Sequence, residues 1–142
     1  MLFRSHARNG ADAIRAAVDP DDPPERRLRA MLTAMVDYLG RHPGTCAGLL
    51  GALGATGQMK EVLQTNDTWI AGPLRDLLSD GRATGAFALD NVADAANAIL
   101  GAVLLAVLGR SMTGADPAEP GFRRQLTEQT LRGILAAKRP RS

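Results

Sequence analysis

The stretch that decides the fold reads VADAANAILGAVLLAVLG, from Val92 to Gly109, and it is apolar or small on every face apart from Asp94 and Asn97. A helix that is apolar all round is either the centre of a large core or a membrane span. The uninterrupted apolar run that begins at Ala98 is shorter than the roughly 20 residues that a bilayer requires, and it lacks flanking aromatic anchors. The stretch therefore predicts a helix at the centre of an all-helical domain outside the membrane.

A chain of 142 residues has limited core with which to cover one helix on all sides. We therefore expect a second copy of the chain to cover the remaining face, in a twofold four-helix interface that also uses the C-terminal helix. Small residues such as Gly101 and Ala102 would allow close approach. The side chains predicted to form this homodimer interface are Ile99, Val103, Val107, Leu126, Thr130 and Ile134.

Short stretches rich in Gly, Pro and Asp divide the rest of the chain into further helices. The expected helices cover about 2–18, 25–39, 43–53, 58–80, 90–110 and 116–138, with a loop over 80–88. Gly40 is expected to end the second helix, and Pro73 is expected to kink the fourth. No segment alternates with period two. The pattern predicts an all-α, six-helix orthogonal bundle, with one domain over 1–138 and a basic tail over 139–142.

Composition and charge exclude several classes of protein. With 45% hydrophobic residues, 23% charged residues and one cysteine, the chain is not a disordered, collagen-like or disulfide-rich protein. The net charge of +2 hides an asymmetry, because residues 122–142 hold six basic groups against one acid and the rest is mildly acidic. This distribution does not predict a DNA-binding face. The single cysteine and the absence of a visible secretory signal favour a cytoplasmic protein.

The motifs that could carry chemistry have simpler structural explanations. Glycines recur every third residue over 48–57, without the Gly-Lys-Ser/Thr of a phosphate loop. His42 and Cys46 lie four residues apart, but a pair supplies only two metal ligands and no orienting or oxyanion partner is evident nearby. The acidic run at 19–22 lacks the spacing of a calcium loop. We therefore predict no catalytic residue, no metal site and no cofactor, so that the chain is not an enzyme.

Soft, bulky side chains recur at positions expected to face inward. Five methionines among few aromatic residues suit a plastic cavity, because methionine repacks around varied shapes. A few polar groups among them would orient a ligand. The candidate ligand-binding residues are Met31, Met35, Tyr38, Cys46, Met59, Trp69 and Asn97.

The stretch DGRATGAFALD, at 80–90, and the apolar helix after it resemble the regulatory domain of TetR-family transcriptional regulators, in which a similar loop leads into the first dimerisation helix. The Arg41-His42-Pro43 segment and the closing LRGIL at 131–135 match the same domain. The resemblance implies an all-α domain that dimerises and binds a small apolar effector, which allosterically controls DNA binding.

In that family, a helix-turn-helix domain precedes the regulatory domain, and nothing in this chain resembles it. Residues 1–5 resemble the start of the connecting helix that follows it. One explanation is that the chain lacks this head through truncation or a gene-start error, so that contact with DNA occurs only through a head absent from this chain. The other is that the domain works without DNA. The alternative function is a helical homodimerisation or protein-interaction module without a small-molecule ligand.

Overall fold

The computed structural model describes residues 2–42, 44–45, 48, 64 and 70–136. These residues form the helices α1 (Leu2–Ala17), α2 (Pro24–Arg41), α5 (Gly72–Ala83), α6 (Val92–Met112) and α7 (Pro120–Arg132). Apart from one isolated bridge, the regular secondary structure of the described residues is helical, which confirms the all-α prediction. The expected helix at 43–53 and most of the first half of the one at 58–80 lie outside the described residues.

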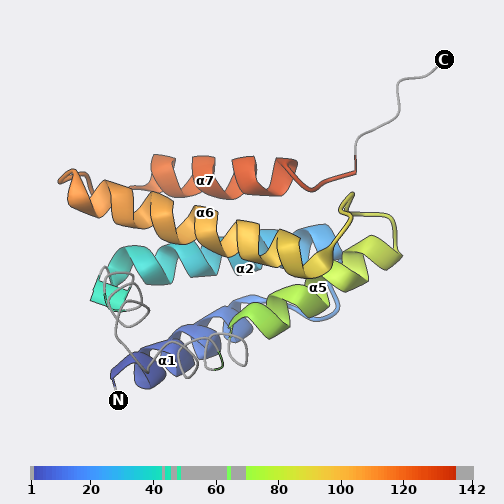
Figure 1. Cartoon of the computed structure of the whole chain (residues 1–142), viewed down its shortest axis with the longest axis horizontal. Helices are drawn as coiled ribbons and strands as arrows, with labels where there is room; N and C mark the ends of the chain where they lie inside the picture. Colours follow the sequence, from blue (N-terminus) through green and yellow to red (C-terminus); the bar gives the residue numbers. More distant parts are fainter. Residues whose placement is uncertain (1, 43, 46–47, 49–63, 65–69, 137–142) are drawn as a thin grey trace.

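Helix α2 forms the centre of the fold, and Figure 1 shows it between α7 on one side and α1 on the other. It packs against each of the other four helices. Apolar side chains at three- and four-residue spacing place one wide face of α2 in the core: Leu28, Met31, Leu32, Met35 and Val36 are all buried. The amphipathic pattern of this segment therefore determines which side of α2 the other helices cover.

Gly40 does not end α2, contrary to the sequence prediction. The helix continues to Arg41, and Gly40 is buried inside it. A Cβ atom at this position would lie 2.8 Å from the carbonyl oxygen of Pro117, in the connection between α6 and α7. The glycine therefore allows two backbones to approach each other, which is a tertiary role that local sequence does not reveal.

The connection between α5 and α6 is held in place by contacts with α5 and with the segment that follows α7. Helix α5 continues to Ala83, beyond the expected end of the helix, and the ring of Phe87 lies directly over Gly81. The N–H of Ala88 donates to Ile134 O at 2.8 Å, and the N–H of Ala136 donates to Ala86 O at 3.1 Å. The two main-chain bonds attach this connection to the end of α7 and leave a bridge of a single residue pair, not a sheet.

Side chains cap the starts of α6 and α7. The Asn91 side chain accepts a bond of 2.9 Å from the N–H of Asp94, so it caps α6. Helix α7 begins at Pro120, later than the expected start at 116, and Glu119 caps it by accepting bonds from two main-chain N–H groups, which lower the pKa of its carboxyl. Pro73 lies in the first turn of α5, directly after a π-helical turn at residues 70–71.

We predict that Gly81→Ala destabilises the fold by about 1–3 kcal/mol, because the new methyl group would overlap the Phe87 ring. The control is Gly133→Ala, at the end of α7, where φ is −65° and an added Cβ meets only an ordinary contact at 3.4 Å. This control should leave the free energy of unfolding unchanged or raise it by up to about 1 kcal/mol. Urea titration measures both values, and equal effects would contradict the proposed overlap.

Candidate functional site

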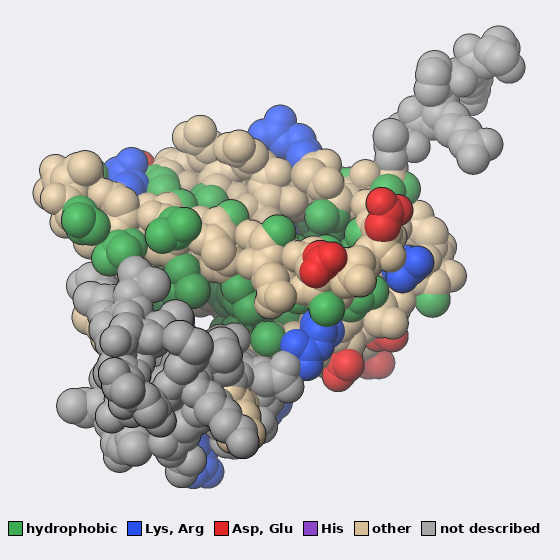
Figure 2. Space-filling model, in the orientation of Figure 1, with side chains coloured by type: hydrophobic (Ala, Val, Ile, Leu, Met, Phe, Trp, Pro, Cys, Tyr) green, Lys and Arg blue, Asp and Glu red, His purple; other side chains and the backbone are tan. Residues whose placement is uncertain are grey.

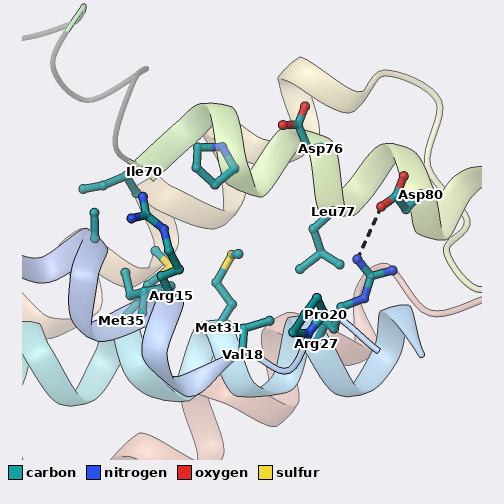
Figure 3. A pocket seen from close by; sticks show the side chains of 13 residues that line it. Arg15, Val18, Pro20, Arg27, Met31, Met35, Ile70, Asp76, Leu77 and Asp80 are labelled. Carbon is teal, nitrogen blue, oxygen red and sulfur yellow. Dashed lines mark hydrogen bonds and ion pairs between the residues drawn. The ribbon is translucent and has the colours of Figure 1, made fainter. Parts of the chain in front are cut away.

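A cavity of about 380 Å³ lies between α1, α2 and α5. Figure 3 shows its side chains converging from these helices, with Leu77 of α5 pointing towards Met31 of α2. Most of its wall is apolar, and its charged groups come from four residues. The lining residues are Ala11, Ile14, Arg15, Val18, Pro20, Arg27, Met31, Met35, Ile70, Pro73, Asp76, Leu77 and Asp80.

The floor of the cavity is formed by α2. Arg27, Met31 and Met35 follow one another at intervals of four residues, so they lie in one row on the helix surface. Both methionines are buried, as is Leu77 opposite them. Unbranched thioether side chains adjust readily to the shape of a bound molecule. The floor is therefore suited to a compact apolar ligand rather than to a polar one.

Arg27 joins three parts of the chain at the edge of the cavity. Its Nε donates to Asp22 O at 3.0 Å, in the connection between α1 and α2, and its Nη1 donates to Asp80 Oδ2 of α5 at 3.3 Å. The Arg27 side chain is 18% exposed, whereas that of Asp80 is 61% exposed. The ion pair lies at the solvent-facing edge, where water and salt weaken it. It can therefore open without exposing the core.

The structure brings together only some of the candidate ligand residues. Met31 and Met35 line the cavity. Tyr38 lines a second groove instead, between α1, α2 and α7, and Asn97 is exposed on α6 and lines neither space. Cys46, Met59 and Trp69 lie outside the described residues.

Sequence reasoning missed several residues that line the cavity, among them Ile14, Val18 and Arg27. Arg27 lies one turn before Met31, so the four-residue spacing along α2 could have revealed it. The lining residues from α1 and α5 could not be predicted in this way, because their positions relative to α2 depend on how the helices pack.

Three side chains that the sequence predicts for the dimer interface lie on the inward face of α6. Ile99, Val103 and Val107 are buried within the single chain, because this face of α6 packs into the core with Ala96 and Leu100. Leu126 on α7 and Ile134, two residues beyond the end of α7, are half-buried against the core. Thr130 is also half-buried, and its hydroxyl donates to Leu126 O at 2.7 Å.

The opposite face of α6 remains uncovered. Leu105 is 63% exposed and Met112 is 78% exposed. Figure 2 shows hydrophobic side chains spread along α6 on the face that this view presents. Small residues, Ala98 and Ala102, continue the same face towards the start of the helix. An exposed apolar surface of this kind is typical of an interaction site.

Helix α6 has 21 residues, so the helix extends beyond the apolar run that begins at Ala98 at both ends. By length and composition alone, it is long and apolar enough to cross a membrane. Only 28% of its most apolar stretch is buried in the single chain. The core helix of a soluble protein meets the same criterion, so one such helix does not indicate a membrane protein. Within the described residues, no three His, Cys, Asp or Glu side chains are grouped to hold a metal ion.

Comparisons with known proteins agree with this architecture. The sequence profile of the "Tetracyclin repressor-like, C-terminal domain" family matches residues 21–106. A solved structure of a protein of unknown function from Rhodococcus sp. RHA1 is similar to this chain with a TM-score of 0.76 and 18% identity, over 96% of this chain and 70% of that one.

A bacterial regulatory protein of the tetR family, from Rhodococcus RHA1, is similar with a TM-score of 0.73 and 20% identity. That match covers 96% of this chain and 74% of the other. At these identities, both likenesses show the fold. No curated protein shows significant sequence similarity to the chain.

We predict that Arg27→Gln destabilises the fold by about 1 kcal/mol, because it removes the ion pair with Asp80 that joins α2 to α5. The control is Arg26→Gln, since Arg26 is the exposed neighbour and does not line the cavity. The control should change the free energy of unfolding by less than about 0.5 kcal/mol. Thermal unfolding at low and high salt measures both variants, and a loss for Arg27→Gln that does not shrink with salt would contradict the ion pair as the cause.

Proposed function

Because this chain belongs to the family of tetracyclin repressor-like C-terminal domains, we propose that it is the effector-sensing and dimerising part of a cytoplasmic TetR-type transcriptional regulator. Its effector is a small, largely apolar molecule. Its role is regulatory and not catalytic, and operator DNA is bound by a helix-turn-helix head outside these 142 residues.

The observation that carries the proposal is the cavity between α1, α2 and α5. Its volume of about 380 Å³ falls in the range of small-molecule sites. Met31 and Met35 on its floor, and Leu77 opposite them, are buried and apolar. A molecule that fills this space would bury apolar surface at roughly 25 cal/mol per Å² before the costs of binding are counted.

The arrangement of α1 supports an allosteric role for this cavity. Among the described helices, α1 has substantial contacts only with α2. Ile14 of α1 and Val18, directly after its end, also line the cavity, so a ligand there touches the same side chains that hold α1 in place. A ligand with different affinities for two positions of α1 shifts the balance between them. In a full-length regulator, this shift would move the DNA-binding heads.

The uncovered face of α6 supports a homodimer through α6 and α7. The exposed side chains of Ala98, Ala102, Leu105 and Met112 form a stripe at three- and four-residue spacing. A second copy would cover this stripe with its own, related by a twofold axis. The half-buried Leu126 and Thr130 of α7 lie at the edge of this proposed interface.

The second candidate function is a homodimerisation module that senses no small molecule. The apolar face of α6 favours it, because that face requires a partner whether or not the cavity binds a ligand. The two functions share the dimer and differ in the cavity. Ligand binding therefore separates them.

We predict that an uncharged hydrophobic compound binds the cavity and raises the melting temperature of the wild-type chain. At 100 times its dissociation constant, a ligand stabilises the folded state by about 2.7 kcal/mol, or about 5–10 °C for a domain of this size. Differential scanning fluorimetry with uncharged probes, including decanol and naphthalene, measures the shift. Met31→Trp, which fills the cavity floor, should abolish it.

An equal shift in wild type and Met31→Trp would place the ligand elsewhere. No shift for any probe would favour the module that senses no ligand.

We predict that Leu105→Asp converts a dimer into a monomer, because it places a carboxylate in the middle of the uncovered α6 face. Ser79→Asp is the control, since it adds the same charge at an exposed position of α5. Sedimentation at micromolar concentration should give a dimer for wild type and Ser79→Asp. A monomeric wild type, or a dimeric Leu105→Asp, would remove the interface.

A further inference from the structure

A second groove, of about 530 Å³, lies between α1, α2 and α7. It uses a different face of α2 from the methionine floor, and Ala13 and Ala17 of α1 line it in place of Ile14 and Val18. Its charged and polar groups gather at the end of α2 and the start of α7: Asp37, Tyr38, Arg41, His42 and Arg123. This groove is therefore distinct from the cavity of the proposed function.

The groove has an excess of positive charge. Asp37 Oδ1 accepts bonds from Arg123 Nη1 at 2.5 Å and forms an ion pair with Arg41 Nε at 3.3 Å. Two guanidinium groups thus share one oxygen of a single carboxylate. Guanidinium groups remain charged at all physiological pH values. One unit of positive charge is therefore left without an opposite charge among the residues that line the groove.

The hydrogen bonds of the Arg123 guanidinium group are also incomplete. Arg123 Nε is buried and has no acceptor among the described residues. A buried N–H group without an acceptor costs about 1–3 kcal/mol, so a fold retains one only where another factor offsets the cost. Side chains of Arg41 and Arg123 are 68% and 27% exposed, so both can be reached from solvent. An incoming carboxylate would therefore meet accessible guanidinium groups.

The rest of the groove suits a planar apolar body. Its floor includes Ala13, Ala17, Ala30 and Ala34, whose short side chains leave a shallow, flat surface. At one end the rings of Tyr38 and His42 stack, with centroids 4.3 Å apart and an angle of 25°.

The orientation of the His42 ring follows from its hydrogen bond. Nδ1 of His42 lies 2.9 Å from Tyr38 O, and since a carbonyl oxygen only accepts, Nδ1 carries the proton. Burial raises the pKa of Tyr38, so its phenol stays neutral beside the arginines.

We propose that this groove is a second ligand site, which binds a small aromatic carboxylic acid. Its carboxylate pairs with Arg41 and Arg123, and its ring lies on the alanine floor beside the Tyr38–His42 stack. Planar, charge-assisted pairs between arginine and carboxylate are among the stronger hydrogen bonds in proteins. A bound acid would contact α1, α2 and α7 together. Such a ligand would therefore act on the chain independently of a ligand in the cavity between α1, α2 and α5.

The test compares 2-naphthoate with 2-naphthamide, two probes of nearly the same shape that differ in charge. Calorimetric titration of the full chain should show naphthoate binding at least tenfold more tightly. Arg41→Gln should weaken naphthoate binding about tenfold. Because the Arg41 side chain is largely exposed, the substitution should leave the melting temperature unchanged, which thermal unfolding checks directly. Arg123→Gln should weaken it similarly. Arg124→Gln, an exposed neighbour outside the groove, is the matched control and should change affinity less than twofold.

A gain of affinity gives a sharper criterion. Asp37→Asn removes the carboxylate that competes for both arginines, so naphthoate should bind about three- to tenfold more tightly. Met31→Trp fills the other cavity and should leave naphthoate binding unchanged.

The proposal is overturned if naphthamide binds as tightly as naphthoate, or if Arg124→Gln weakens binding as much as Arg41→Gln. It is also overturned if Met31→Trp abolishes naphthoate binding, or if no saturable binding occurs.

Discussion

The burial of one face of α2 is the constraint on which the rest of the described structure depends. Leu28, Leu32 and Val36 are completely buried, and each contributes about 1.5–3 kcal/mol by leaving water. Because α1, α5, α6 and α7 all pack against this helix, its orientation determines where each of them lies. The cavity between α1, α2 and α5 and the second groove open on two neighbouring faces of α2. A ligand in either one would therefore contact this helix.

Charged side chains at the edge of this core join α2 to its neighbours. Arg27 reaches Asp80 of α5, and Arg29 donates to both carboxylate oxygens of Glu128 of α7, which lowers the pKa of that carboxyl. These pairs are partly exposed, so each contributes little to stability. The core therefore keeps the domain folded, while the pairs at its edge can rearrange at small cost.

Local pattern predicted much of this architecture. The apolar stretch from Val92 forms a helix as the sequence predicts, and two of the side chains expected to face inward, Met31 and Met35, line a cavity. The buried side of α6 could not be predicted in this way. Its apolar residues surround the helix, so no periodic contrast distinguishes Ile99 and Val103, which pack inside, from Leu105, which faces outward.

The sequence by itself determined the helical class and the approximate extent of the described helices, because periodicity and helix-breaking residues act over a few positions. Only the tertiary structure decided how those elements meet. Gly40 lies against Pro117, and Arg123 pairs with Asp37, although each contact joins residues that are more than 70 positions apart. Such close approaches follow from the packing of whole helices, and for that reason no local pattern in the chain records them.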